Sequence, residues 1–280
     1  MKLDYMPPPA DLADYISAFY LFEAELDELN DVERADIAQF RVVLSGSGTV
    51  TFADGRAQDF TGVSLFGPRM GASRITARGP VMRLFGCGVL PAGWALSIRR
   101  PAHQSINSVI PADDILKAAF PTLVAEISAC STLGEMAALA CACCRTHFSQ
   151  VDLKPVQFVR TLNAWLESSL VPLISDLEAQ TGLSQRQIER LANHYFGAPP
   201  KFLIRKYRAL RAANQIANGD GEWQDFIDSV YYDQPHFIRE IKEFIGMTPS
   251  AIRNANSPLS MLAFGRARLA GSVSPLVSET

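Results

Sequence analysis

Two short stretches of this 280-residue chain place amide and cationic side chains opposite an apolar helical face. The polar side of the first stretch carries Gln185, Arg186, Arg190 and Asn193. The polar side of the second carries Gln234, His236 and Arg239. Arg can bind the edge of guanine with two hydrogen bonds, and Gln or Asn can bind adenine in the same way. These residue types at this spacing therefore predict contact with base edges in duplex DNA.

The charge of the chain supports this chemistry only locally. The formal net charge is -3, which gives no general attraction to nucleic acid. Residues 184–211, however, contain seven basic side chains against the single acid Glu189, a net charge of +6. Such a run attracts phosphate, and we expect Lys206 within it to contact the DNA backbone. The alternative interpretation of the run is a solvated helix face.

The two stretches belong to a duplicated structural unit. A shift of 49 residues superimposes them and places Gly197 on Gly246. Ser184 with Gln187 forms a capping-box pattern, and Asp233 occupies the capping position of the second copy. Each unit is therefore predicted as helix, tight turn and helix, with the glycine ending the second helix. In DNA-binding units of this kind, the second helix enters the major groove while the first crosses the backbone.

These residues carry a resemblance to a known family. Residues 183–190 (LSQRQIER) and 196–201 (FGAPPK) resemble the first half of an AraC/XylS-type DNA-binding domain, and residues 232–240 (YDQPHFIRE) and 244–253 (FIGMTPSAIR) resemble its second half. The resemblance covers about residues 157–255, with a basic helix at 200–218 joining the units. It implies a transcription regulator that binds double-stranded DNA at an operator or promoter, with two recognition helices of one subunit in successive major grooves. Tyr231 and Pro235 depart from the usual Gly and Ser of the family.

Tyr231 leaves two structures open for the turn of the second unit. The repeat places it opposite Gly182, where a left-handed residue is expected at the end of a helix. If both turns have the same backbone, Tyr231 adopts a positive φ at a cost of about 1 kcal/mol or more, which its ring would offset by packing on Phe226 or Phe237. The alternative is a rearranged turn with a displaced recognition helix. We favour the left-handed Tyr231.

The first half of the chain has the pattern of short strands and turns. Strands are predicted at 40–44 and 49–52 around a turn at Ser45–Gly48, and further strands at 63–66, 73–77 and 81–89. The acidic stretch Asp11–Ala35 instead has a helix-like spacing of apolar residues. The chain is therefore predicted to be α+β, with a β-rich N-terminal barrel and an all-α C-terminal part of two units joined by a helix.

A looser resemblance suggests the role of this first half. Residues 84–94 (LFGCGVLPAGW) resemble the end of the barrel in cupin-like sensor domains that precede AraC-type domains. This implies a cupin-like regulatory domain with flanking helices over residues 1–110 and a helical linker or dimerisation region over 111–154. We expect the DNA-binding domain over 155–256 and a flexible, Ser- and Ala-rich tail over 257–280. Activity is expected to respond to a ligand or to dimerisation, with RNA polymerase and a second copy as further candidate partners and the effector unknown.

Other chemistries have weaker support. Of the four histidines only His103 is near the strand-rich half, so the ligand set of a metal-binding cupin is missing, and we expect no metal, cofactor or catalytic residue. The cluster of Cys141, Cys143, Cys144 and His147 either binds metal or senses oxidants, or consists of small buried hydrophobic residues, which its divergent helical spacing favours. A cupin-like small-molecule-binding protein or enzyme with a structural helical domain remains the alternative function.

The composition excludes several classes of protein. A hydrophobic content of 48% with 20% charged residues excludes wholesale disorder and collagen-like chains. No apolar run approaches the roughly 18 residues of a membrane span, and the first residues lack a signal-peptide pattern. Five cysteines are too few for a disulfide framework. We therefore expect a soluble protein of the bacterial cytoplasm, associated with the nucleoid and not with a membrane.

Overall fold

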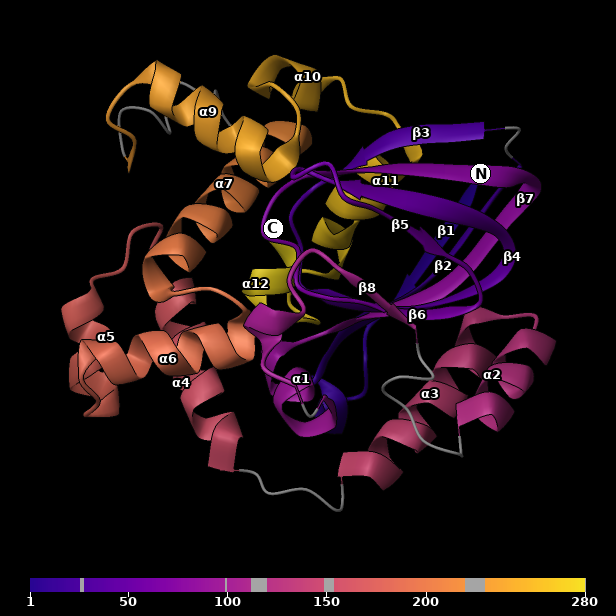
Figure 1. Cartoon of the computed structure of the whole chain (residues 1–280), viewed down its shortest axis with the longest axis horizontal. Helices are drawn as coiled ribbons and strands as arrows, with labels where there is room; N and C mark the ends of the chain where they lie inside the picture. The colour runs from indigo at the N-terminus through magenta and orange to yellow at the C-terminus, as the bar shows by residue number, and fades with distance from the viewer. Residues whose placement is uncertain (26–27, 99, 112–119, 149–153, 220–229, 280) are drawn as a thin grey trace.

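The computed structural model describes residues 1–25, 28–98, 100–111, 120–148, 154–219 and 230–279. Figure 1 shows a β-rich half beside a helical half. The strands are β1 (Lys2–Met6), β2 (Ile16–Glu25), β3 (Glu28–Glu33), β4 (Ala38–Phe52), β5 (Ala57–Phe60), β6 (Val63–Phe66), β7 (Ser73–Val89) and β8 (Val109–Pro111). The helices up to the second unit are α1 (Pro91–Ser97), α2 (Phe120–Ala129), α3 (Leu133–Phe148), α4 (Lys154–Glu167), α5 (Ile174–Thr181), α6 (Gln185–Phe196), α7 (Pro200–Asn218) and α9 (Gln234–Ile245). The remaining helical segments are η1 (Ala10–Leu12), η2 (Ala102–Gln104), α10 (Pro249–Arg253), α11 (Pro258–Phe264), η4 (Gly265–Leu269) and α12 (Pro275–Ser278).

Two long bent strands carry the sheet. β4 and β7 pair antiparallel from Ala38 opposite Val89 to Phe52 opposite Ser73. β2 and β3 pair with successive parts of β7, while β6 and β5 pair with successive parts of β4. The main hydrogen-bonded order is β1-β2-β7-β4-β6-β8. The α+β class is confirmed, but among the described residues the sheet does not close into the expected barrel.

The glycine-rich segment Ser45–Gly48, predicted as a turn, lies inside β4. The register of β4 against β7 shifts between Val43 and Ser45 and again between Ser45 and Ser47. Bulges of this kind bend a strand without ending it. Gly46, at φ 89°, adopts a backbone conformation that other residues rarely tolerate. For the same reason the strands predicted at 73–77 and 81–89 are one bent strand, β7.

The helix-like stretch Asp11–Ala35 is mostly strand, so this prediction is wrong. Residues 16–22 of β2 are all buried. Tyr20 and Phe22 face the interior of the bent sheet, whereas Phe19 and Leu21 belong to the core beneath α2 and α3. A strand covered on both faces has a continuous apolar run, and hydrophobic spacing alone does not distinguish such a run from a buried helix.

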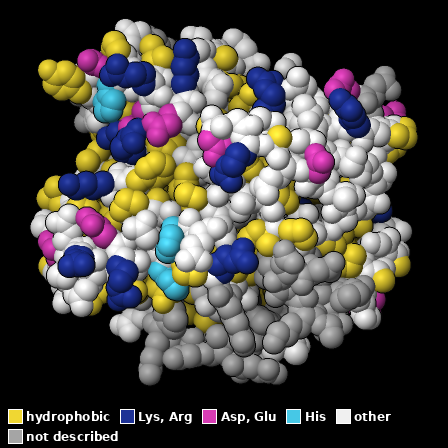
Figure 2. Space-filling model, in the orientation of Figure 1, with side chains coloured by type: hydrophobic (Ala, Val, Ile, Leu, Met, Phe, Trp, Pro, Cys, Tyr) yellow, Lys and Arg dark blue, Asp and Glu magenta, His cyan; other side chains and the backbone are white. Residues whose placement is uncertain are grey.

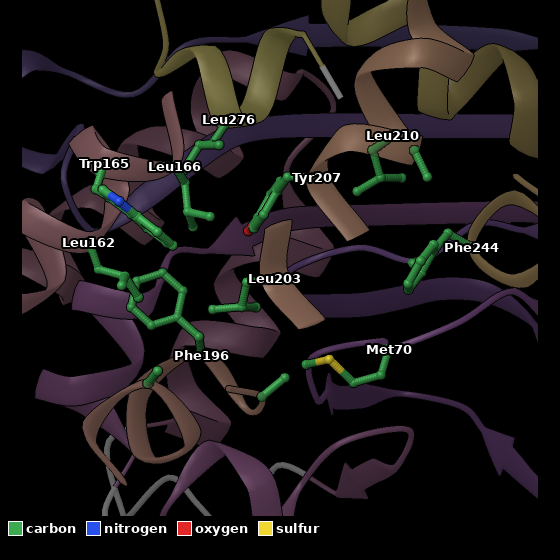
Figure 3. Close-up of a cluster of buried hydrophobic side chains, with 14 of the residues drawn as sticks. Met70, Leu162, Trp165, Leu166, Phe196, Leu203, Tyr207, Leu210, Phe244 and Leu276 are labelled. Carbon is green, nitrogen blue, oxygen red and sulfur yellow. The ribbon is translucent and has the colours of Figure 1, made fainter. Parts of the chain in front are cut away.

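The largest hydrophobic core lies among the helices and extends into the β-rich half. Figure 3 shows Trp165, Phe196, Tyr207 and Phe244 of this core. Met70, from the segment between β6 and β7, belongs to the same cluster. The two halves therefore share buried apolar surface, which favours one fixed arrangement over independent movement.

The last segment differs from the flexible tail that its composition suggested. Ser257–Glu279 forms α11, η4 and α12 and packs between the sheet and the helices (Figure 1). Leu276 and Val277 are buried in hydrophobic clusters, and the buried side chain of Arg266 pairs with Asp36. A few well-placed apolar groups and one ion pair hold the segment although its average composition is polar. The other domain boundaries remain predictions.

Candidate nucleic-acid interface

The first recognition helix, α6, has the caps and faces that its sequence predicts. The Ser184 N–H donates to Oε1 of Gln187 at 3.0 Å, which ties the first turn of the helix. Ile188 and Ala192 are fully buried on the inner face. The outer face exposes Gln185, Arg186 and Arg190. The helix ends at Gly197, which has the left-handed conformation (φ 88°).

The second recognition helix, α9, repeats this construction. The Asp233 carboxylate accepts a hydrogen bond from the His236 N–H at 2.7 Å, and Pro235 lies in the first turn, where its missing N–H needs no partner. Phe237 is buried on the inner face, while Gln234 is exposed on the outer face. The helix ends at the left-handed Gly246 (φ 79°). The duplicated capping that the sequence predicted is confirmed. The helix expected before α9 lies mostly outside the described residues.

Helix α7 connects the two units through a buried ion-pair network. Glu240 of α9 has a fully buried side chain and accepts hydrogen bonds from Arg208 at 2.6 and 2.9 Å and from Arg205 at 3.0 Å. Arg205 also donates to Glu243 at 2.5 Å. Because a buried carboxylate is stable only with partners of this kind, the network fixes α9 on α7.

The second part of the basic run of residues 184–211 is not a solvated face. Lys206, Arg208 and Arg211 are all less than 9% exposed. Lys206 donates from Nζ to the carbonyl oxygen of Asp36 at 2.7 Å, and burial lowers its pKa to about 7. The predicted contact of Lys206 with phosphate is therefore wrong for this arrangement. Sequence charge could not reveal this, because α7 is covered by the sheet and by its neighbouring helices.

The remaining predicted residues differ in their availability. Gln185 donates to Glu189 on the surface of α6 at 2.9 Å, an exposed contact that DNA can replace. Asn193 is half-buried, and its amide donates to the Glu189 carbonyl at 2.8 Å. His236 is also half-buried, with Nε2 3.7 Å from the Glu240 carboxylate, and Arg239 is exposed on α9. In both recognition helices, the exposed Arg and Gln side chains thus lie in the first two turns.

Figure 2 shows Lys and Arg side chains on the side of the molecule where α6 and α9 lie in Figure 1, with acidic side chains between them. Residues 177–255 match a family model described as a helix-turn-helix domain. This is the part of the chain that holds both capped helices and both AraC/XylS-type motifs. The helical half carries an AraC-type helix–turn–helix domain. Residues 4–111 match a second family model, described as a domain of unknown function (DUF6597).

A relative of the AraC-type domain is named as an HTH-type transcriptional regulator, YkgA of Escherichia coli (strain K12). It is 31% identical over 101 residues, which are 35% of this chain and 42% of the relative. The chain thus matches less than half of that relative's length.

Two solved structures of ToxT from Vibrio cholerae are also similar. The unsaturated fatty acid bound form from strain SCE256 has a TM-score of 0.48 and 10% identity, covering 83% of this chain and 93% of that one. The form from strain O395 has a TM-score of 0.44 and 9% identity, covering 81% of this chain and 97% of that one.

The turn before α9 in the AraC-type domain is not strained at Tyr231. Among the described residues only Asn107 is a non-glycine residue with positive φ, so the left-handed Tyr231 is wrong. Its ring is 7% exposed and packs edge-on against Phe237, with centroids 4.9 Å apart. The Arg208 guanidinium lies 4.3 Å from the ring centroid. Phe226, the other expected partner, lies outside the described residues.

One exposed residue of this domain was missed by the sequence reasoning. Tyr232, directly before the cap of α9, is 93% exposed. Its position one residue before Asp233 was the available signal, because the N-terminal end of a recognition helix is the end that contacts DNA. An almost fully exposed ring beside Gln234 is therefore part of the candidate interface.

Outside the AraC-type domain, the cysteine cluster lies on α3. Cys141 is buried, Cys144 half-buried and Cys143 exposed. Partial removal from water raises the pKa of each of these thiols, to about 12 for Cys144, which disfavours the thiolate that binds metals. The side chain of His147 lies outside the described residues. Within the described ranges, no group of three or more His, Cys, Asp or Glu is placed to hold a metal, and no helix is long and apolar enough to cross a membrane.

Proposed function

We propose that this protein is a sequence-specific DNA-binding regulator of transcription in which one subunit inserts α6 and α9 into successive major grooves. One observation carries the proposal. Each of the two helices exposes side chains of its first turn, while its last turn ends at a glycine and packs on the rest of the molecule. The helix–turn–helix match and the named relative support the same function. The proposed site of action is the bacterial cytoplasm, at the nucleoid.

The two helices are proposed to read bases with different side chains. On α6, Arg186 and Arg190 present guanidinium groups suited to guanine, and Gln185 presents an amide suited to adenine. Asn193, at the far end of α6, is the least accessible of the proposed readers. On α9 the proposed readers are Gln234, His236 and Arg239, with the exposed ring of Tyr232 against the sugar-phosphate backbone.

The β-rich half is proposed to regulate this activity. The proposed place for a small-molecule effector is the small, mostly apolar cavity between the bent sheet and α11, which is lined in part by Tyr20, Arg41, Phe60, Met82 and Leu262. Residues 111–154 are proposed to link the halves or to pair with a second copy. RNA polymerase is the proposed partner at a promoter.

Selection from a random duplex library tests the proposal without knowledge of the operator. The wild-type protein is expected to enrich one sequence with two half-sites about one helical turn apart. Arg186→Ala and Arg190→Ala should each weaken binding to that sequence by about 1–3 kcal/mol. Arg78→Ala, at an exposed position of β7, is the control and should bind like the wild type.

Two outcomes would contradict the proposal. If Arg186→Ala loses as much affinity for random DNA as for the selected sequence, Arg186 does not read bases. If no sequence is enriched, the alternative of a small-molecule-binding protein or enzyme with a structural helical domain is favoured.

A further inference from the structure

The segment Ser257–Glu279, which we call the strap, contacts both halves of the molecule. At its sheet end, Arg266 donates two hydrogen bonds to the Asp36 carboxylate, at 2.7 and 3.1 Å. Both side chains are buried. The Leu259 N–H donates to the carboxylate of Asp31, on β3, at 2.8 Å. The start of the strap is therefore fixed to the β-rich half by two acidic residues.

The end of the strap is fixed to the helices. The Ser274 hydroxyl donates to Glu167 of α4 at 2.6 Å, and the Asn214 amide of α7 donates to the Ser278 carbonyl at 3.3 Å. Leu276 points into the core of the helical half, as Figure 3 shows. The strap thus crosses from the sheet to the helices that support both recognition units.

Asp36, which pairs with the strap, is adjacent in sequence to a residue that contacts the second recognition helix. Asp36 follows Ala35, whose N–H donates to the carbonyl of Phe244 in the last turn of α9 at 2.7 Å. The Ala72 N–H donates to the carbonyl of Glu243 at 2.9 Å. Two backbone hydrogen bonds therefore join the β-rich half to the end of α9.

The first recognition helix ends against the same half of the molecule. His103 Nδ1 lies 3.3 Å from the carbonyl oxygen of Asn193 in the last turn of α6. Gly197, which ends α6, is so close to Ile106 and Met70 that a Cβ there would lie 2.8 Å from each. The β-rich half thus holds the last turns of both helices, while the first turns, which would meet DNA, are exposed.

We propose that the strap is a clamp that keeps the two recognition helices at one fixed spacing, and that Arg266 is a positioning residue for DNA binding. Burial alone would raise the pKa of Asp36, but the guanidinium groups of Arg266, Arg34 and Arg69 hold it well below its usual range. Asp36 is therefore ionised, and the loss of Arg266 removes its two shortest ion-pair contacts.

The clamp matters only when both helices bind at once. Engaging a second half-site costs little when its helix is already in place, whereas a loosened helix must first be ordered. Releasing the strap should therefore weaken binding to a duplex with two half-sites by about 10-fold. Binding to a single half-site should change little, because neither reading surface is altered.

Amide hydrogen exchange of the DNA-free protein tests the clamp itself. Arg266→Met should speed exchange of the Ala35 and Ala72 amides, which donate to the end of α9. Arg268→Met is the matched control, because Arg268 lies on the same strap and is exposed. Arg266→Lys retains the charge and should restore part of the protection. Unchanged exchange in a folded Arg266→Met protein would overturn the proposal.

DNA binding tests the consequence, which rests on the proposed function. The probes are the duplex selected by the wild-type protein and the same duplex with one half-site replaced by unrelated sequence. Arg266→Met should lose affinity for the first probe only. An equal loss on both probes, or a gain on the first, would overturn the positioning role. If the wild type selects no sequence, the proposed function fails, while the exchange result still decides whether the clamp exists.

A second variant covers the case in which Arg266→Met does not fold. Ser274→Ala removes the hydrogen bond to Glu167 and leaves the buried ion pair in place. Circular dichroism establishes that the variant is folded. It should show the same pattern on the two DNA probes at a smaller amplitude, and an unchanged ratio of the two affinities would count against the clamp.

Discussion

Replacing Gly246 by alanine should destabilise the protein through the contact between its two halves. Gly246 has φ 79°, and a Cβ at this position would lie 2.5 Å from Cγ1 of Val32 and 2.9 Å from Cβ of Ala72. Val32 can rotate its side chain, but the Ala72 Cβ moves only with the backbone. Gly182 is the matched control, because it has φ 65° and nothing within 4 Å of the added Cβ.

The expected size of the effect follows from these two environments. An alanine in the left-handed conformation destabilises the folded state by about 1–2 kcal/mol. Replacing glycine also reduces the conformational entropy of the unfolded chain, which stabilises the protein by about 0.4–1 kcal/mol. Gly182→Ala should therefore lower the free energy of unfolding by about 1 kcal/mol. Gly246→Ala adds the cost of overpacking, about 1–3 kcal/mol, so a total of about 2–4 kcal/mol is expected.

Urea unfolding followed by circular dichroism measures both variants against the wild type. If Gly246→Ala and Gly182→Ala are equally destabilising, the end of α9 is not packed on Val32 and Ala72 in solution, and the reasoning is refuted. A third variant, Gly246→Ala with Val32→Ala, should recover part of the loss, because it removes the nearer of the two obstructing atoms.

Three further predictions concern other parts of the interface and its support. Tyr232→Ala should reduce affinity for the selected duplex while changing the free energy of unfolding by less than about 0.5 kcal/mol, since the ring is 93% exposed; a gel-shift titration and a thermal melt measure the two. Glu240→Ala should destabilise the fold by about 3–5 kcal/mol in urea unfolding, because it leaves Arg208 buried without its carboxylate, and a loss below 1 kcal/mol would contradict the network. Lys206 has its pKa lowered to about 7, so the unfolded chain binds more protons than the folded one between pH 7 and about 10.5. As the pH rises across that range, the free energy of unfolding of the wild type should therefore increase relative to that of Lys206→Met. If the two free energies change in parallel with pH, the pKa of the buried Lys206 amine is not lowered.

The sequence predicted the recognition helices because the signals that define them are local. Ser184, Asp233, Gly197 and Gly246 act within one turn of their own helix, and each has the predicted role. The repeat wrongly predicts that Tyr231 has the left-handed backbone of Gly182. It fixes the spacing of the two units but not the backbone conformation of each turn.

The remaining errors arise from long-range contacts. The bent strands β4 and β7 contain glycines that mark bulges, and a turn and a bulge have the same local composition. The charge pattern alone predicts that Lys206 contacts DNA, because a lysine on a helix is usually exposed. Its burial depends on Asp36, which is 170 residues away. The ordered structure of the strap was not predicted for a similar reason, because the strap is held by the ion pair between Arg266 and the distant Asp36.

The burial of the α7 cations also limits how strongly salt should affect binding. Of the Arg and Lys side chains on α6, α9 and the start of α7, the exposed ones are Arg186, Arg190, Lys201, Arg239 and Lys242. Each cation that neutralises a phosphate releases about 0.9 condensed counterions from B-DNA. Five such contacts would give a slope of about -4.5 in a plot of log affinity against log salt concentration, and every Arg that binds a base instead makes the slope shallower. Because the buried arginines and lysine of α7 stabilise the fold and take no part in the exchange of ions at the DNA surface, affinity should fall less steeply with salt than a count of all basic residues on these helices would suggest.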